Sequence, residues 1–267
     1  MKIVIVTWIL CVAASAQING TIIVFEWTRD GLFIAADSRS TFDKRPPEDD
    51  HCKIAALNHN TVFAVSGAVA GGYPIDPSDP VHPWDAIHDA RLALDVTPVG
   101  GNAQDMAASI ADTWARKIVF DWNMVKIWHP EVVRWADKVN NGTLTSGLFA
   151  TTKDGIVGLA ARHIKLNGDR VSFEVVPLTE ICGFERLCGF GRLDIFFEFG
   201  NRTSDRARGA EGTMPNSFRL QVLRMVDLTI AYDKTGTVGG PIDSLQLSPD
   251  GRITWFHQKQ DCPENHR

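Results

Sequence analysis

Residues 20–41 read GTIIVFEWTRDGLFIAADSRST, and they carry the clearest indication of the fold. Two apolar runs, 21–27 and 32–36, are rich in the β-branched and aromatic residues that favour strands. The turn sequence Thr28-Arg-Asp-Gly31 separates them, so we expect a β-hairpin. Both runs are apolar at nearly every position, and such strands lie inside a layered structure with both faces covered.

The remaining chain continues as strands, then helices, then strands, a helix and strands. A second hairpin is expected where the apolar runs 53–57 and 61–66 flank Asn58-His-Asn60. Further elements are predicted from periodicity and turn residues: strands within 144–176, 241–247 and 252–257, and helices near 84–95, 103–125 (capped by Asn102) and 215–232. The predicted fold class is therefore α+β, a four-layer αββα sandwich of two antiparallel sheets with the helices outside.

The first residues have the pattern of a signal peptide. Met1-Lys2 is followed by an apolar run over 3–13 and by Ala14-Ser-Ala16, an A-x-A cleavage site. We expect a signal peptide over 1–16, a short propeptide over 17–20 and one domain over 21–267, in which the Pro- and Gly-rich stretch 71–101 is an insertion. The predicted location is secreted or periplasmic; the alternative for the apolar run is a buried N-terminal strand.

Export changes what the cysteines imply. Cys52, Cys182, Cys188 and Cys262 remain after signal cleavage, and four cysteines in an oxidising compartment permit two disulfides with three pairings. The most local pair is Cys182–Cys188. For Cys52, which lies in an apolar strand pattern, we expect a buried free thiol.

Composition and motifs exclude several functions. The formal charge of −5, the pI near 5.9 and the lack of a basic run argue against binding nucleic acid or an anionic membrane. Gly189-x-Gly191 has Asp194 where a dinucleotide fingerprint needs a third glycine, and His51 and His59 lack zinc spacing. We expect no cofactor and no metal.

Four residues in the first two hairpins stand at a notable spacing: Thr21 after a glycine, Asp37 after the second strand, Lys53 on the third and Gly67 at the end of the fourth. Together they resemble the opening of a proteasome β subunit, an N-terminal-nucleophile (Ntn) hydrolase, and indicate an exported bacterial-type homologue. The resemblance is close over residues 20–70, loose in the middle, and returns at Gly239-Gly-Pro-Ile-Asp243.

The resemblance implies catalytic roles for Thr21, Asp37, Lys53 and Gly67. A threonine hydroxyl needs a base, and the free α-amine of an N-terminal threonine has a pKa of about 7.7–8.0, which suits that task. Lys53 would supply a positive charge, Asp37 would pair with Lys53, and the Gly67 N–H would stabilise the oxyanion. The Gly20–Thr21 bond must be cut first.

Further residues would bind substrate or support the nucleophile. The resemblance places an extended substrate between Thr41 and Gly67, and Arg39 and Asp233 are candidate supports. Thr235 and Val238 stand where the family has an aspartate and a serine; the second serine belongs near 188–191. The residues expected to line a modest apolar specificity pocket are Ser40, His51, Ala55, Val65 and Val69.

The predicted function is therefore an exported threonine-type peptidase or amidase that acts on a peptide or amide substrate through an acyl-enzyme. We expect it to bind no nucleic acid, and no membrane after signal cleavage. Assembly into a homo-oligomer is left open. Two alternatives remain: an acylase for non-peptide amides with the same chemistry, and a catalytically silent domain of this fold that binds or scaffolds.

Overall fold

The hairpin predicted over residues 21–36 forms the centre of one sheet. In the computed structural model, β2 (Ile22–Thr28) pairs antiparallel with β3 (Gly31–Ala36), and every residue of β3 is buried. The structure describes residues 17–19, 21–28, 30–41, 46–49, 51–73, 82–98, 100–140, 142–182, 187–200, 217–259 and 262. The predicted signal peptide over 1–16 lies outside these residues, and so does Gly20.

Two antiparallel sheets make up the centre of the molecule. The smaller has the order β10-β2-β3-β11-β12 and adds β10 (Leu187–Gly191), β11 (Asp243–Leu247) and β12 (Ile253–His257) to the hairpin. The larger has the order β1-β5-β7-β8-β9, and β4 and β6 also pair with β5. Its strands are β1 (Gln17–Asn19), β4 (Ile54–Asn58), β5 (Thr61–Tyr73), β6 (His82–Asp85), β7 (Thr143–Lys153), β8 (Ile156–Asn167) and β9 (Arg170–Val175).

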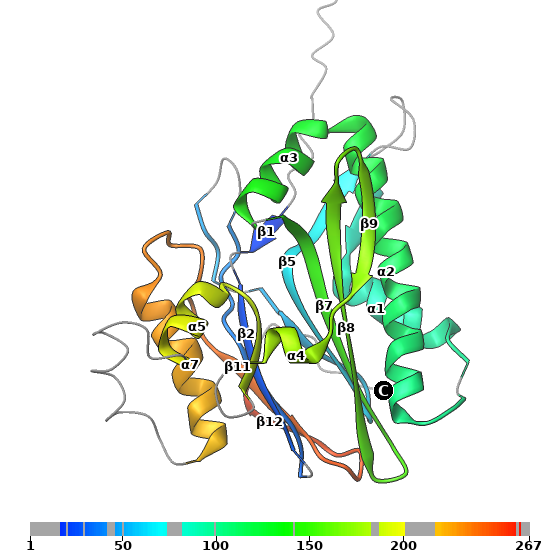
Figure 1. Ribbon diagram of the computed structural model, residues 1–267, viewed down its shortest axis with the longest axis vertical. Helices are drawn as coiled ribbons and strands as arrows, with labels where there is room; N and C mark the ends of the chain where they lie inside the picture. Colours follow the sequence, from blue (N-terminus) through cyan, green and yellow to red (C-terminus); the bar gives the residue numbers. More distant parts are fainter. Residues whose placement is uncertain are drawn as a thin grey trace, which may run out of the picture.

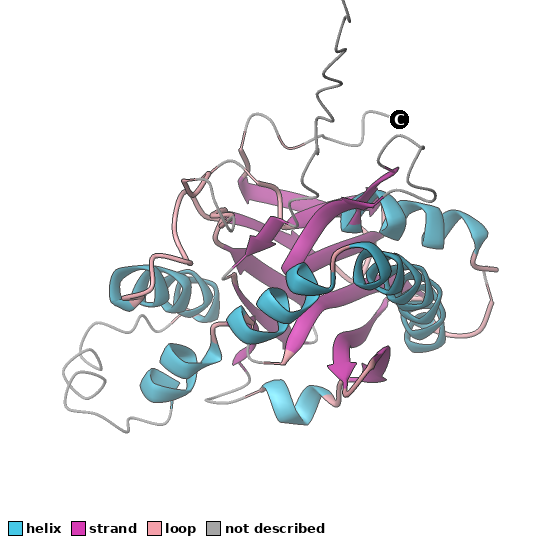
Figure 2. Ribbon diagram, turned by 90° about the horizontal axis from the view of Figure 1, so that it is seen from above, coloured by secondary structure: helices cyan, strands magenta, loops and turns pink. Residues whose placement is uncertain are grey.

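Helices cover the outer face of each sheet, as Figures 1 and 2 show. The larger sheet is covered by α1 (Ala86–Val96), α2 (Ala103–Trp128) and α3 (Pro130–Val139). The smaller sheet is covered by α5 (Leu193–Gly200) and α7 (Phe218–Tyr232), while the short α4 (Leu178–Ile181) precedes β10. One apolar cluster lies between the sheets and one lies under each helical layer. The predicted αββα sandwich is confirmed.

The longest helix illustrates how local sequence sets these layers. Asn102 and Asp105 form a capping box at the start of α2, which satisfies N–H groups that the first turn leaves free. Trp114 and Trp122 are fully buried on the face toward the sheet. Gly147 on β7 makes room for the first ring, since a Cβ there would lie 2.5 Å from Trp114. Helix α2 and the larger sheet therefore pack closely.

Some elements differ from those expected. The structure adds β1, β6, β10, α3 and α5, and α2 runs on to Trp128. The sequence of β10, LCGFG, has no β-branched residue and does not indicate a strand by itself. The segment forms a strand because it pairs with β2. The stretch 71–101, predicted as an insertion, contains the last residues of β5 and the whole of β6 and α1. Among the described residues, no helix combines the length and apolar character needed to cross a membrane.

Candidate active site

Thr21 lies at the start of β2, completely buried, and its backbone is held on both sides. Its carbonyl oxygen accepts a hydrogen bond from the Arg192 N–H at 2.9 Å. The next N–H, of Ile22, donates to Asp37 Oδ1 at 3.0 Å. The Thr21 hydroxyl oxygen is buried and has no hydrogen-bond partner among the described residues. A buried hydroxyl without a partner is destabilising, so its presence requires an explanation.

Asp37 and Lys53 form a buried ion pair next to this backbone. Lys53 Nζ lies 2.9 Å from Asp37 Oδ1, and both side chains are 0% exposed. Lys53 also donates to the Arg39 carbonyl oxygen at 2.6 Å. Asp37 Oδ1 thus accepts from both Ile22 and Lys53, which brings the ammonium close to the start of β2. Two of the four predicted catalytic residues are in direct contact, and Asp37 joins them to the residue after Thr21.

Burial dominates the electrostatics of this pair. It lowers the pKa of Lys53 to about 8, while the Asp37 carboxylate opposes the shift and the Lys259 charge adds to it. Burial also raises the pKa of Asp37, against the opposing effects of the Lys53 charge and the N–H groups of Gly239 and Ile22. Lys53 can therefore change its charge near neutral pH, which an exposed lysine does not do.

Gly67 sits in the middle of β5 with a φ of 81°, a conformation that favours glycine. A Cβ at this position would lie 2.5 Å from the Leu144 carbonyl oxygen. Gly67 pairs with Thr145 of β7 on one side and with Asn19 of β1 on the other. Residues 17–19, which precede Thr21, therefore lie as an antiparallel strand on the edge of β5 where a substrate strand is predicted.

The residues predicted to bind substrate fall into two groups. Ser40, Thr41 and His51 lie on the loops between β3 and β4, where Ser40 bridges to Glu48 and His51 Nε2 lies 3.1 Å from a Glu48 carboxylate oxygen. The apolar members belong to the buried cluster beneath the outer helices: Ala55, Val65 and Val69. That these residues line a specificity pocket stays a prediction.

Of the two candidate supports, Arg39 forms a bidentate pair with Asp49, at 2.7 and 2.8 Å. The Asp233 carboxylate accepts from the N–H groups of Thr237 and Val238, at 2.7 and 2.8 Å. Within the part of the chain that the structure describes, Asp233 makes no hydrogen bond to Thr21, and its bonds order its own loop. Val238 is buried in the apolar cluster beneath α7, where a serine is expected from the resemblance.

Two neighbours of Thr21 were not predicted as site residues. Gly191 has a φ of 90°, and a Cβ there would lie 1.7 Å from the Thr21 carbonyl oxygen. Arg192 follows it and donates its N–H to the same oxygen. The only sequence signal was the Cys188–Gly191 segment, predicted to lie near the nucleophile, and its pairing of Gly191 with Ile22 agrees with that location.

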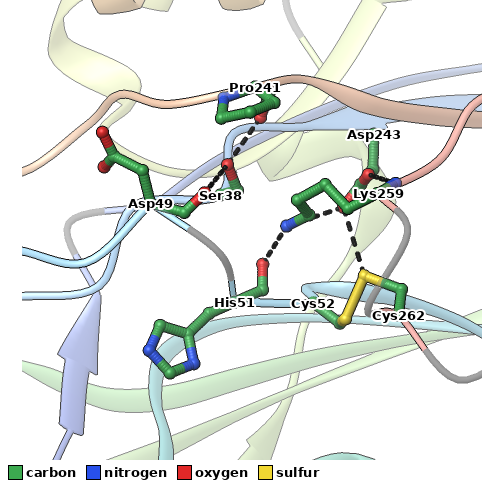
Figure 3. Close-up of a disulfide and its surroundings, with 8 residues drawn as sticks. All are labelled: Ser38, Asp49, His51, Cys52, Pro241, Asp243, Lys259 and Cys262. Atoms are coloured by element: carbon green, nitrogen blue, oxygen red, sulfur yellow. Dashed lines mark hydrogen bonds and ion pairs between the residues drawn. A yellow bond between two sulfur atoms is a disulfide. The ribbon is translucent and has the colours of Figure 1, made fainter.

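A disulfide involves Cys52, the residue before Lys53. Cys52 is bonded to Cys262 across a sequence separation of 210, and Lys259 donates to the His51 carbonyl oxygen and pairs with Asp243 at 2.9 Å (Figure 3). The prediction of a free thiol at Cys52 is wrong, because the segment after β12 returns along residues 51–53. The predicted local pair Cys182–Cys188 forms. Within the described part of the chain, no group of three or more His, Cys, Asp or Glu could hold a metal ion.

No family model and no curated protein matches the chain. Among solved structures, the chain is similar to Anbu from Hyphomicrobium sp. strain MC1, in its (Gly-1) mutant form. That similarity has a TM-score of 0.46 at 17% sequence identity, and it covers 90% of this chain and 89% of the other. A similarity at this level assigns neither a family nor an activity.

The interpretation of the chain as an exported bacterial-type homologue of proteasome β subunits is therefore wrong. The lack of any matching family and the low identity to Anbu overturn it. Thr21 and Asp37 flank the β2–β3 hairpin of the smaller sheet, whereas Lys53 and Gly67 belong to the region of the β4–β5 hairpin of the larger sheet, so the packing of the two sheets brings the two pairs together. The case for a site now depends on the contacts around Thr21.

Proposed function

We propose that this chain is a hydrolase of the N-terminal-nucleophile type, with Thr21 as its nucleophile after removal of residues 1–20. One observation carries the proposal: the fully buried Thr21 hydroxyl has no partner among the described residues, and the N–H of the next residue, Ile22, contacts the buried Asp37–Lys53 pair. Lysine ammonium has three donors, and the contacts of Lys53 with Asp37 and the Arg39 carbonyl use two. The third donor is available to the Thr21 hydroxyl.

Removal of the leader would be a reaction of the same hydroxyl. Residues 17–19 already lie on β5 beside Gly67, as an extended substrate would. The Thr21 Oγ attacks the Gly20 carbonyl carbon, and the bond from that carbon to the Thr21 nitrogen breaks. The nitrogen takes up the proton and becomes the free α-amine. Water then hydrolyses the ester and releases the leader.

Turnover would repeat this chemistry on a second amide bond. The free α-amine takes the proton from Oγ, directly or through one water, while the Lys53 charge favours the alkoxide and keeps the amine neutral. Oγ attacks the substrate carbonyl, whose oxygen is stabilised by the Gly67 N–H. The leaving amine takes the proton, and water hydrolyses the acyl-enzyme. Asp37 keeps Lys53 charged and in place.

The proposed substrate is a peptide or another amide bound as an added strand on β5. The apolar character of Val65 and Val69 supports a preference for neutral or apolar side chains at the cleaved position. A panel of fluorogenic peptides and simple amides, differing only in that residue, tests this. Equal rates after Leu, Arg and Glu would refute the preference, and cleavage of simple amides alone would identify an acylase.

The proposed location is outside the cytoplasm, secreted or periplasmic. The signal-like residues 1–16 and two disulfides, Cys52–Cys262 and Cys182–Cys188, support it, because disulfides persist in oxidising compartments. Mass spectrometry of the exported protein checks it: the two bridges should be oxidised and residues 1–16 should be absent.

A specific observation favours one other function, a silent domain that binds or scaffolds. Val238 and Thr235 replace polar groups expected near the nucleophile, and the Asp233 carboxylate is engaged in its own loop. A domain of this kind would keep residues 17–20 attached. The state of its N-terminus therefore separates it from the hydrolase.

The decisive experiment is to sequence the N-terminus of the purified protein, beside Thr21→Ser and Thr21→Val. The wild type and Thr21→Ser should begin at residue 21, and Thr21→Val should keep the leader. A threonine-directed covalent inhibitor should then label only the processed forms. Thr254→Ala, at an exposed position on β12, is the matched control. A wild-type protein that stays uncut and unlabelled would refute the hydrolase and favour the silent domain.

A further inference from the structure

A second set of contacts approaches Thr21 from the turn between β10 and α5. The Arg192 N–H reaches the Thr21 carbonyl oxygen at 2.9 Å, and Gly191 allows that approach because it has no side chain. The backbone of Arg192 is thus fixed against the proposed nucleophile. Its guanidinium extends away from that point, toward the loop between α7 and β11.

The guanidinium of Arg192 binds that loop. Nη1 donates to the Thr235 hydroxyl at 2.8 Å and lies 3.3 Å from Asp233 Oδ1. Nε and Nη2 also form a bidentate pair with Asp194, at 3.0 and 2.9 Å. The Asp194 side chain is 61% exposed, whereas that of Asp233 is 0% exposed. The pair with Asp194 is therefore open to water, which weakens exposed ion pairs, whereas the contact with Asp233 reaches a buried carboxylate.

Asp233 in turn orders the loop that follows it. Oδ1 accepts from the N–H and the hydroxyl of Thr235, at 3.0 and 2.6 Å. Oδ2 accepts from the N–H groups of Thr237 and Val238. These bonds, with Arg192, hold the pKa of Asp233 below its usual value even though burial acts to raise it. A carboxylate that accepts this many bonds sets the course of the backbone up to residue 238.

The loop then returns to the proposed catalytic pair. The Gly239 N–H donates to Asp37 Oδ2 at 3.0 Å, and the other oxygen of Asp37 accepts from Ile22 and Lys53. The contacts therefore close a ring that begins and ends at Thr21. The links are hydrogen bonds, one ion pair, and the peptide bonds that join Val238 to Gly239 and Thr21 to Ile22.

We infer that Arg192 and Asp233 form a positioning clamp, which holds the loop at 233–239 so that the Gly239 N–H fixes the Asp37–Lys53 pair against Thr21. The inference rests on the proposed function and deepens it. Neither residue touches the reacting atoms, so both are positioning residues. The clamp occupies the region where Thr235 and Val238 replace polar support groups, and it provides support by another route.

The test uses the full-length exported protein with Arg192→Ala, Asp233→Asn, the double variant, and Arg192→Lys. A threonine-directed covalent inhibitor measures the inactivation rate constant and the inhibitor affinity separately. The rate constant should fall about 10- to 100-fold in both single variants, since small misplacements of reacting groups have effects of this size. Affinity should stay within about two-fold, because the clamp does not touch the inhibitor.

Two features distinguish a clamp from general support of the fold. The double variant should be no slower than the slower single variant, because the two residues act as one unit. Arg192→Lys should recover part of the rate, since it keeps the charge opposite Asp233. Hydrogen exchange gives a readout that needs no activity: the Gly239 amide should lose protection in Arg192→Ala. Arg252→Ala removes an exposed arginine on another turn and is the control.

The outcomes separate the two proposals. A wild type that is neither cut nor labelled would refute the proposed function. A labelled wild type with Arg192→Ala equally fast, and the Gly239 amide still protected, would overturn the clamp alone. If Arg192→Ala does not fold, Arg192→Lys and Asp233→Asn are compared with the wild type instead. Additive losses of rate in the double variant would also overturn the clamp.

Discussion

Replacing Lys53 by methionine should destabilise the protein by an amount that its contacts define. The change keeps an unbranched side chain, one heavy atom shorter, and removes the charge, so the buried Asp37 carboxylate loses its ion partner. Breaking a buried pair from one side costs about 3–5 kcal/mol. Asp37 keeps the N–H groups of Ile22 and Gly239, which favours the lower end, about 3 kcal/mol. The midpoint of thermal unfolding should fall by about 6–12 °C.

The pH dependence of this loss has a definite sign. Burial already raises the pKa of Asp37, and in Lys53→Met the loss of the Lys53 charge raises it further, so the folded state binds more protons than the unfolded state between the two pKa values. Stability then falls as pH rises through that window, and the loss is smallest in acid. In Asp37→Asn the lone Lys53 has a pKa still further below its usual value, and stability rises with pH through the window that ends at the unfolded pKa.

The assay is urea denaturation from pH 5 to pH 10 in a Thr21→Ala background, in which no chain is processed. Opposite pH slopes for Lys53→Met and Asp37→Asn, with a double variant less destabilised than the sum, would support the buried pair. Lys138→Met, at an exposed position on α3, should stay within about 0.5 kcal/mol and is the control. Equal slopes, or a loss in Lys53→Met no larger than in the control, would refute the reasoning.

Three further predictions concern the site. Thr21→Val should abolish processing, and in a Lys53→Met background, in which no chain is expected to be processed, it should raise the free energy of unfolding by about 1 kcal/mol over Thr21, because a buried hydroxyl without a partner is destabilising; equal stability in denaturation curves would contradict this. Inhibitor labelling should rise with pH as the free amine loses its proton and fall above about pH 8 as Lys53 loses its charge; a rate that climbs steadily to pH 10 would exclude a charged Lys53. Reducing Cys52–Cys262 should cost at most about 5 kcal/mol by the loop-entropy estimate and also slow labelling; thermal melts of Cys262→Ser check this, and an unchanged melting temperature would show that the bridge contributes nothing.

Much of the fold could be predicted because local rules were sufficient. The first hairpin follows from two apolar runs and a turn ending at Gly31, and α2 follows from its period and the Asn102 cap. The strand β10 and the helix α5 could not be predicted, since their short segments are stabilised by contacts with β2 and α7. The Cys52–Cys262 bridge was missed for the same reason, because its two cysteines meet only after both sheets form.

The candidate site likewise contains residues that were predicted from the sequence and residues that only the tertiary structure shows. Thr21, Asp37, Lys53 and Gly67 were predicted from the sequence because their order and spacing resemble the opening of a proteasome β subunit, and the structure contains both of the predicted hairpins, β2–β3 and β4–β5. Tertiary structure alone brings in the rest, since Gly191, Arg192 and the loop at 233–239 come from strands and turns more than a hundred residues downstream. Backbone N–H groups donate those hydrogen bonds, and every residue type except proline has one. No side-chain pattern in the sequence therefore indicates that the Arg192 and Gly239 N–H groups hold Thr21 and Asp37 in place.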